Sequence, residues 1–593
     1  MPRPLALFLA AGLLASLPLA AAQSAMPPME GMHAFPPPDQ LPPPMRMTGI
    51  GNSHIAIKAT PEAQAWFDQG LSLLHDFWDY ESARAFEQGI RVDPNCAMCY
   101  WGLAQAEGMR GTGTKTYADQ ALDHAVRLES KASKTDRLYI EAAKAASQQQ
   151  EGENQKAIAL CRELVKKNPH DIQARIFLAS VVGDGYDENG NPKPGTKEKI
   201  AILESVLKDA PNDSAANHYW IHAMEPGNHP ERAIDSAARL ASLAPTSGHM
   251  VHMPGHIYYR VGDYASADRW FTASMETDER YLKEQHVSVD DDWNYVHNMM
   301  YAIANLMEQG RLTDANALSD HLAAARGELS ATLYVWSARD QMSRVSRRLP
   351  VALRTGDWSA VLTMVDDANL PDASNTANLR LLRDELRSFA TGMQAIEDGD
   401  LATAQAASAQ MDAGLWREGQ DADPKAKSDA VAAATKPDKP TAPVNPDAIA
   451  GPLVQTLSVA SLELRGSIQL AQGNLEAGKK LYTRAIADEK KLGYHEPPLY
   501  IRPVAETEGE ALLRAKDYAG AKEAYQKALD ERPKSGWELY GIARADELAG
   551  NTAAAQTEYA AFLKAWPSAD AGLPEMEHAK AAGATAETLA GNQ

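Results

Sequence analysis

Two pairs of histidines have a spacing that suggests chemistry. His218 and His222 stand four residues apart, and 34 residues later His252 and His256 repeat that spacing. A spacing of four places both imidazoles of a pair on one face of a helix. If the two helices are neighbours in a stack, the four rings share one surface. Neutral imidazoles bind zinc, copper, iron and nickel, so the pattern predicts either a metal site or a polar binding surface.

The elements that must position these side chains are helical hairpins with a repeat of 34 residues. The clearest copies are C-terminal: Gly509, Ala521, Tyr525, Ala528 and Pro533 are followed 34 residues later by Ala543, Ala555, Tyr559, Phe562 and Pro567. Further prolines close earlier units at positions 94, 169, 211 and 245. Small residues at fixed offsets let paired helices approach, and the proline ends the second helix. This pattern is typical of tetratricopeptide (TPR) repeats.

Aligning the two central repeats on their closing prolines adds further residues to the histidine surface. His249 takes the second repeat position, His297 takes it in the following unit, and Glu225 takes the twelfth, all of which are expected to face a concave groove. A carboxylate beside imidazoles can be a ligand, an orienting group or a general base. The predicted metal ligands are His218, His222, Glu225, His249, His252, His256 and His297. The predicted groove-binding residues are Tyr259, Arg260 and Asn298.

Composition limits the location and partners of the chain. Residues 1–22 are typical of a secretory signal peptide, with Arg3, an apolar stretch and cleavage expected after Ala22, so we expect a periplasmic or secreted protein. No later stretch approaches the roughly 18–20 apolar residues of a membrane span. The net charge of −21 argues against nucleic acid as a partner. Cys96 and Cys99 could form a small disulfide or remain packed thiols, as Cys161 could.

The chain is expected to divide into two solenoid segments. We predict a signal peptide over 1–22, a disordered arm rich in Met and Pro over 23–52, an N-terminal solenoid over 53–411, a low-complexity linker over 412–450, C-terminal repeats over 451–570 and a tail over 571–593. In the arm, Met26, Met29, Met32 and His33 could supply soft ligands to copper(I), although methionine is common in disordered arms. Residues 183–195 only partly match a calcium loop and are interpreted as a turn-rich loop.

Several stretches resemble a family of bacterial TPR proteins, exported or cytoplasmic, whose activity is not established. They include DPNCAMCYWGLAQA (93–106), NHYWIHAMEPGNHPERA (217–233), SGHMVHMPGHIYYRVGDYASA (247–267), VHNMMYAIANLMEQGR (296–311), HEPPLYIRPVAETEGEALL (495–513) and SGWELYGIARA (535–545). The family has a similar His-rich block followed by a His-Asn pair, here His297-Asn298. The resemblance therefore implies a shared site without implying its reaction. Position 296 departs from the family, because it is a valine where the resemblance leads us to expect a proline.

The sequence thus predicts an all-α TPR-type solenoid with two alternative functions. The first is a periplasmic binding module that captures a peptide, protein or small ligand in a His-lined groove. The second is a metalloprotein that binds copper, zinc or iron, with or without a metal-dependent reaction. No G-x-S-x-G, H-E-x-x-H, P-loop or Gly-rich dinucleotide turn is present, so the motifs assign no reaction.

Overall fold

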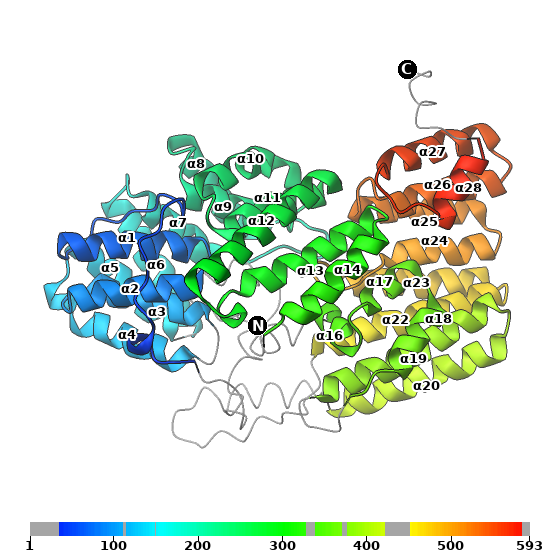
Figure 1. The fold of residues 1–593 in the computed structure, drawn as a ribbon, viewed down its shortest axis with the longest axis horizontal. Helices are drawn as coiled ribbons and strands as arrows, with labels where there is room; N and C mark the ends of the chain where they lie inside the picture. Colours follow the sequence, from blue (N-terminus) through cyan, green and yellow to red (C-terminus); the bar gives the residue numbers. More distant parts are fainter. Residues whose placement is uncertain are drawn as a thin grey trace. The chain divides into compact units, whose positions relative to one another are not determined.

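The computed structural model describes residues 35–110, 114–148, 150–327, 338–370, 376–421 and 451–583, and helices dominate all of them (Figure 1). The first helices are α1 (Pro61–His75), α2 (Asp79–Val92), α3 (Ala97–Met109), α4 (Lys115–Arg127), α5 (Lys134–Ser147), α6 (Glu151–Lys167), α7 (Ile172–Val182), α8 (Pro194–Asp209), α9 (Ser214–Met224), α10 (Ile234–Leu243), α11 (Gly248–Arg260), α12 (Tyr264–Gln285) and α13 (Trp293–Glu308). Short 3-10 turns occur at Pro38–Gln40, Glu129–Lys131, Pro230–Ala233 and Val289–Asp291.

The later helices continue the pattern. They are α14 (Leu312–Ala325), α16 (Ala338–Val345), α17 (Leu349–Thr355), α18 (Trp358–Asp366), α19 (Ala377–Glu397), α20 (Leu401–Asp421), α22 (Gly451–Ala471), α23 (Leu475–Lys490), α24 (Val504–Arg514), α25 (Tyr518–Glu531), α26 (Gly536–Leu548), α27 (Thr552–Ala565) and α28 (Pro574–Ala581). Consecutive helices pack as hairpins, α1 with α2, α3 with α4 and α26 with α27 among them. The predicted all-α helical-repeat solenoid is confirmed.

The predicted closing prolines lie where the second helix of a hairpin ends. Pro169, Pro211 and Pro245 each stand two residues beyond the last residue of α6, α8 and α10. Pro533 and Pro567 stand in the same relation to α25 and α27. A proline there prevents the helix from continuing, because its ring excludes the helical conformation of the residue before it.

Close helix packing explains the small residues of the repeat. A Cβ atom added at Gly255 on α11 would lie 2.4 Å from the ring of Phe271 on α12. The same atom at Gly102 on α3 would lie 2.2 Å from the ring of Phe86 on α2. In both places an aromatic ring fills the space that a side chain would need. At Gly255 this packing also sets the distance between the two helices beside the histidines.

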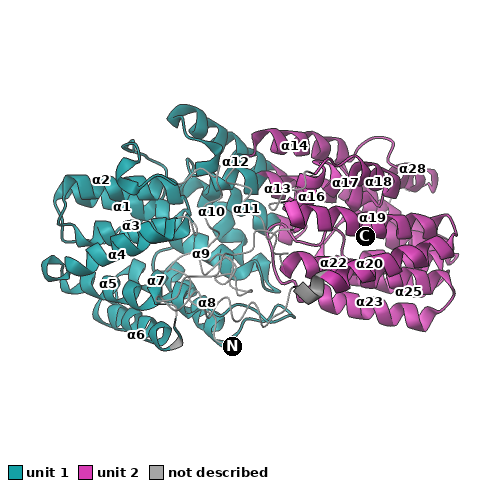
Figure 2. Ribbon diagram, turned by 90° about the horizontal axis from the view of Figure 1, so that it is seen from below, with its two compact units in different colours: residues 1–258, 269–298, 327–329 teal, residues 259–268, 299–326, 330–593 magenta. Residues whose placement is uncertain are grey.

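The chain forms two compact units (Figure 2). Unit 1 comprises residues 1–258, 269–298 and 327–329, and unit 2 comprises residues 259–268, 299–326 and 330–593. This division differs from the expected one, which placed the boundary in a linker at 412–450. Within unit 2, α22 packs against α19 and α20, so helices on both sides of the expected linker share one core. The linker prediction is wrong for residues 412–421, which belong to α20, and residues 422–450 lie outside the described residues.

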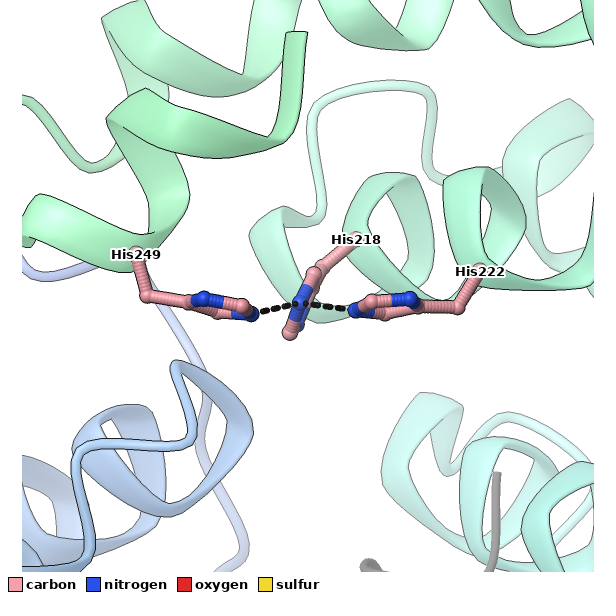
Figure 3. Close-up of side chains that lie close together, drawn as sticks. All are labelled: His218, His222 and His249. Atoms are coloured by element: carbon pink, nitrogen blue, oxygen red, sulfur yellow. Dashed lines mark hydrogen bonds between the residues drawn. The ribbon is translucent and has the colours of Figure 1, made fainter. Parts of the chain in front are cut away.

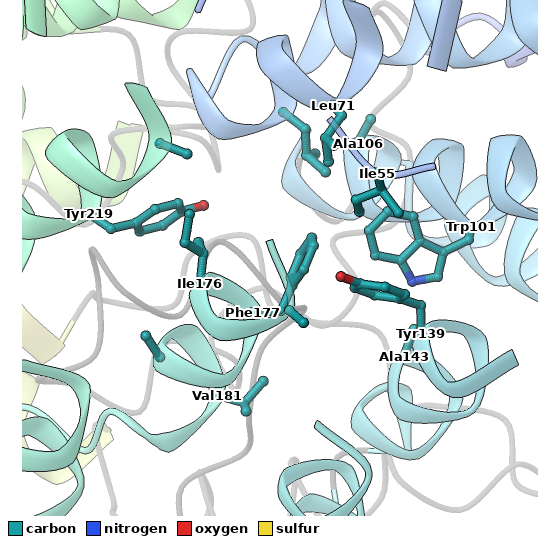
Figure 4. Packing of buried hydrophobic residues seen from close by; sticks show 14 of the residues in the cluster. Ile55, Leu71, Trp101, Ala106, Tyr139, Ala143, Ile176, Phe177, Val181 and Tyr219 are labelled. Atoms are coloured by element: carbon teal, nitrogen blue, oxygen red, sulfur yellow. The ribbon is translucent and has the colours of Figure 1, made fainter. Parts of the chain in front are cut away.

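The core of unit 1 is continuous from α1 to α11 (Figure 4). At its centre Trp101, Tyr139 and Phe177 meet edge to face, with ring centroids 5.2–5.6 Å apart. Such aromatic pairs add stability beyond the area that they bury. The helices that carry the histidines therefore rest on a well-packed core.

The N-terminal arm is ordered where the structure describes it, so the prediction of disorder is wrong for residues 35–52. The Arg84 guanidinium donates to the carbonyls of Pro42 and Pro43, at 2.9 and 2.8 Å. Gln69 exchanges two hydrogen bonds with the backbone of residues 45 and 47. The arm lacks a core of its own but uses polar side chains of α1 and α2 as partners. Residues 23–34, with Met26, Met29, Met32 and His33, lie outside the described residues, as does the predicted signal peptide.

Smaller predictions resolve as follows. Cys96 and Cys99 form a disulfide at the start of α3, and Cys161 is a buried thiol. Residues 183–195 form a turn in which Asp187 accepts hydrogen bonds from the amides of residues 189 and 191. The predicted C-terminal tail is wrong for residues 574–581, which form α28 and pack on α27. In the described part of the chain, none of the helices is both long and apolar enough to cross a membrane.

Candidate metal centre

Six histidines of unit 1, supplied by three helices, form one cluster, here called the histidine cluster. They are His218 and His222 on α9, His249, His252 and His256 on α11, and His297 on α13. The Asp213 carboxylate caps α9 by accepting from the amide of Ala216, which fixes where the helix begins. None of the six residues is more than 6% exposed. The imidazoles are therefore enclosed, whereas the sequence analysis placed them on an open groove.

The first triad consists of His218, His222 and His249 (Figure 3). His218 lies between the other two rings, and its Nε2 is 3.0 Å from Nε2 of His222 and 3.1 Å from Nε2 of His249. One nitrogen of each ring can be chosen so that all three lie within 4.8 Å of one another. Three ring nitrogens thus point at one place.

In the two histidines of α9, the other ring nitrogen, Nδ1, faces an oxygen atom that can only accept a hydrogen bond. His218 Nδ1 lies 2.6 Å from the carbonyl oxygen of His75. His222 Nδ1 lies 2.5 Å from Oε1 of Glu225. An oxygen without a hydrogen requires an N–H opposite it, so both Nδ1 atoms carry the proton. In a neutral imidazole, Nε2 is then a bare lone pair.

The same reasoning fixes the third ring. His249 Nδ1 lies 3.1 Å from Oδ1 of Asn294. The orientation of that amide follows from its other end, because Asn294 Nδ2 donates to Asp278 at 2.7 Å and to Ser274 at 3.3 Å. His249 therefore donates from Nδ1 and also presents a bare Nε2.

Three lone pairs at this spacing repel one another unless a cation lies among them. Nitrogen ligands bound at about 2.0–2.1 Å lie roughly 2.9–3.5 Å apart when the angle at the metal is between 90° and 120°. The observed separations of 3.0 and 3.1 Å fall in that range. Two of the three separations in the first triad therefore suit a metal ion, and the ligand atoms of all three rings lie within 4.8 Å of one another.

The second triad consists of His252, His256 and His297. His252 Nδ1 lies 2.6 Å from Oδ1 of Asn298, whose Nδ2 donates to the carbonyl of Phe271 at 2.8 Å. The Nε2 atoms of His252 and His256 approach to 2.5 Å, and the His297 ring lies 4.9 Å from that of His252. The three rings can also offer ligand atoms within 4.8 Å of one another. To hold a metal, His252 and His256 would have to separate by several tenths of an ångström.

Glu225 joins the two triads. Its Oε1 faces His222 Nδ1 at 2.5 Å, and its Oε2 faces His256 Nδ1 at 2.7 Å. The residue is 1% exposed and stands at the C-cap of α9. One carboxylate oxygen therefore orients a ring of the first triad and the other orients a ring of the second, in the way that carboxylates hold metal-ligating histidines.

Burial favours the neutral form of five of the six imidazoles. Desolvation lowers the pKa of His249 to about 3 and lowers the pKa values of His218, His222, His252 and His297 well below 6.5. Neighbouring imidazoles lower them further, because a second positive charge nearby is unfavourable. Neutral imidazole is the form that binds metals.

Aromatic rings enclose the first triad. Phe77 stacks on His222 and His249 with centroids 5.5 Å away in each case, and its edge meets His218 at 4.6 Å. Phe77 has a φ of 57°, a strained backbone conformation for a bulky residue. Trp293 donates from its indole nitrogen to the Phe77 carbonyl at 2.9 Å. Strain of this kind is concentrated at functional sites, and here it places a ring over the ligands.

The three predicted groove residues have different positions. Asn298 is buried and orients His252, as described above. Tyr259 is buried in unit 2 and packs on Tyr264 and Tyr301. Arg260, also in unit 2, is partly buried, with its guanidinium 5.8 Å from the ring of Tyr494.

Sequence reasoning missed three contributors to the cluster. His75 supplies a carbonyl and Phe77 a ring from the end of α1, and Asn294 supplies an amide from α13. The first two have no detectable signal, since they lie more than 140 residues before His218 in the sequence. Asn294 and Asn298 stand four apart beside His297, and that repetition of the histidine spacing could have drawn attention to both.

Comparisons with known proteins add only a distant structural likeness. No family model and no curated protein matches the chain. The crystal structure of yeast Tom70 aligns with 88% of this chain and 95% of its own, at 14% identity and a TM-score of 0.29. The Cut9-Hcn1 hetero-tetramer of APC/C aligns with 76% of this chain and 96% of its own, at 13% identity and a TM-score of 0.23. The assignment of a helical-repeat fold therefore rests on the helices themselves, and the resemblance to a bacterial TPR family stays a prediction.

Proposed function

We propose that this protein binds a transition metal ion through Nε2 of His218, His222 and His249. The observation that carries the proposal is the convergence of three lone pairs, each opposite a ring nitrogen whose proton is held by an oxygen. A histidine cluster with a purely structural role would be expected to alternate donors and acceptors, so that each ring nitrogen gains a hydrogen bond.

The ligand set favours copper, zinc or iron. Imidazole nitrogens suit these metals, whereas magnesium and calcium prefer oxygen ligands. The proposal covers binding of the metal, as storage or transfer would require. The nitrogen ligands alone do not assign a reaction, and none is proposed.

The test is metal analysis of the chain purified without a His tag and loaded with copper(I) without oxygen, or with zinc(II) or iron(II). We expect His218→Ala/His222→Ala to abolish binding at the first triad while the far-ultraviolet circular dichroism stays helical. The matched control is His54→Ala/His229→Ala, because both of these side chains are exposed, at 59% and 73%. Equal metal content in the control, the wild type and the cluster variant would overturn the proposal, as would a wild type that binds no metal.

We propose, as a second function, that the stacked hairpins capture a peptide or protein. The repeat architecture supports this, because solenoids expose long surfaces formed by successive repeats. A partner bound in this way should remain bound after the protein is treated with a chelator. A partner released by the chelator would instead connect capture to the metal.

We also propose that the protein works in the periplasm or outside the cell. The signal-like residues 1–22 support this location, and so does the disulfide between Cys96 and Cys99, since disulfides persist in oxidising compartments. Fractionation of cells that produce the full chain tests the location, and a product found only in the cytoplasm with residues 1–22 intact would contradict it.

A further inference from the structure

We propose that the chain binds a pair of copper(I) ions, one in each triad, coupled through Glu225. This inference rests on the proposed function, because the second ion is expected beside the first. Four lines of evidence support it: the repetition of the ligand set, the shared carboxylate, the limited negative charge that it supplies and the coordination number of copper(I).

The ligand set occurs twice because it lies in two successive copies of the 34-residue repeat. His252 and His256 on α11 occupy the positions of His218 and His222 on α9, 34 residues later. Each pair gains a third ring from the next helix to carry histidines, His249 on α11 for the first and His297 on α13 for the second. Two successive repeats therefore form two three-nitrogen sites by one rule.

The carboxylate of Glu225 connects these sites. It accepts one N–H from each triad, from His222 at 2.5 Å and from His256 at 2.7 Å. A cation on Nε2 of either ring makes the Nδ1 proton more acidic and strengthens its bond to the carboxylate. The ions thus share one anion and one source of orientation.

The charge around the pair favours ions of low charge. Glu225 is the carboxylate that bonds to the rings, and the buried amine of Lys199 also interacts with it. Desolvation lowers the pKa of Lys199 to about 8, and the charge of Glu225 opposes that shift. The carboxylate of Glu225, partly offset by this amine, cannot by itself neutralise two divalent ions. The repulsion between two divalent ions is four times that between two monovalent ions at the same distance.

Coordination number points in the same direction. Each triad offers three imidazoles in a buried setting lined by Phe77, Phe271 and Trp293. Zinc(II) at a three-histidine site takes a further ligand, normally water or hydroxide. Copper(I) is stable with three nitrogens and needs no added anion. The enclosure and the charge therefore select copper(I) over zinc(II) for a double occupancy.

The experiment is an anaerobic titration of the full chain with copper(I) against a chromophoric copper(I) chelator, with zinc(II) titrated separately. We expect two copper(I) ions per chain and a second zinc(II) ion at least about 100-fold weaker than the first. The variants His218→Ala/His222→Ala and His252→Ala/His256→Ala should each retain one copper(I). If the wild type bound only one copper(I), and either variant abolished that binding, the chain would have a single site and the proposed pair would be overturned.

Glu225→Gln tests the coupling. Glutamine presents one oxygen and one NH₂ group, so it can accept from one ring while its NH₂ group opposes the N–H of the other. We expect one copper(I) site to keep its affinity and the other to weaken about 10–100-fold. Unchanged affinities at both sites would overturn the role of Glu225, and two zinc(II) ions held as tightly as two copper(I) ions would overturn the charge argument.

The matched control is Glu231→Gln. Glu231 also faces a histidine Nδ1, that of His229 at 3.0 Å, but this pair is exposed and outside the cluster. It should leave both copper(I) affinities unchanged. A wild type that binds no metal would defeat the proposed function itself, whereas one ion per chain, or two ions indifferent to Glu225, would defeat only the coupled pair.

Discussion

The histidine cluster of unit 1 and an ionic network in unit 2 both consist of buried polar groups, but these groups are paired in opposite ways. In unit 2, Arg354 donates to Glu506 at 2.8 Å and to Glu308 at 3.2 Å, and Arg502 reaches Glu506 at 3.2 Å. Ser535 completes the network with a hydrogen bond of 2.9 Å to Glu308. There Arg354 and Arg502 each have a carboxylate opposite them, whereas the histidine cluster places acceptors opposite acceptors.

The pKa shifts follow that difference. Desolvation opposes the charge of Arg354, but Glu308 and Glu506 outweigh it and raise the pKa of the guanidinium. Desolvation of His218 has no such compensation, and its pKa falls. Unit 2 thus buries charges that neutralise one another, and unit 1 buries neutral groups that would accept a positive charge from outside. The comparison teaches that a buried polar cluster needs a ligand only when its own groups leave it incomplete.

The largest expected effect is a loss of stability when the ionic network of unit 2 is broken. Glu506→Ala removes a carboxylate that faces both Arg354 and Arg502, and leaves these cations buried with less compensation. We expect the free energy of unfolding to fall by about 3–5 kcal/mol in urea denaturation, with metal content unchanged. Glu577→Ala, in an exposed pair with Lys580, is the control and should change stability little. Loss of metal on Glu506→Ala would contradict the independence of the two clusters.

The histidine cluster should instead gain stability when a metal ion binds to it. At a free metal concentration 100 times the dissociation constant, binding to the folded state adds about 2.7 kcal/mol of stability. We expect a rise in the unfolding temperature of the wild type and of Glu506→Ala, measured by calorimetry with and without metal. His218→Ala/His222→Ala should lose the contribution of the first triad. An equal rise in that variant would place the metal elsewhere.

A smaller effect should come from the residue that orients His249. Asn294→Leu removes the oxygen opposite Nδ1, so the imidazole can protonate on the other nitrogen and lose its ligand lone pair. We expect metal affinity at the first triad to fall about 10–100-fold, equivalent to roughly 1.4–2.7 kcal/mol.

The control for this change is Asn305→Leu. Asn305 is equally buried, lies in unit 2 and donates to the carbonyl of Tyr264 at 3.0 Å. It should lower stability without changing metal affinity. If both leucine variants weakened metal binding alike, the effect would reflect general loosening of the fold and the orienting role of Asn294 would be wrong.

Much of the fold and part of the candidate centre could be predicted because the evidence is local. Closing prolines, small residues at helix crossings and histidines four apart are properties of one or two turns of helix. A repeat of 34 residues then carries the pattern from α9 to α11 and brings His218 near His249. The burial of the cluster could not be predicted in this way, because it depends on Phe77, which lies in the turn after α1, and on Trp293 at the start of α13.

The ordered arm shows the same limit. Residues 35–52 are too rich in proline to bury a core, and composition alone indicates disorder. Their order comes from Arg84 and Gln69, which donate to backbone carbonyls of the arm. Composition records what a segment can bury by itself and does not record the partners that another segment provides.

A pH-dependent effect concerns His75, whose backbone carbonyl orients the ring of His218. His75 is fully buried beside Tyr219, and desolvation lowers its pKa to about 3, partly opposed by a hydrogen bond from Gln173. Its unfolded pKa is about 6.5. A neutral buried histidine therefore contributes stability that is fully present above pH 6.5 and is lost as the pH falls toward 3.

We expect His75→Gln to isolate that contribution in the metal-free protein. Glutamine cannot take up a proton, so below pH 6.5 the wild type should lose about 1.4 kcal/mol per pH unit relative to the variant, measured by urea denaturation at several pH values. The difference should be constant above pH 7. Glu506 behaves otherwise: desolvation opposes ionisation, but Arg354 and Arg502 lower its pKa, so its contribution persists above pH 4.5 and is lost only in stronger acid. A difference between wild type and His75→Gln that stayed constant from pH 8 to pH 4 would mean that the imidazole takes up its proton as readily in the folded protein as in the unfolded chain, and the contrast between a neutral and an ionised cluster would fail.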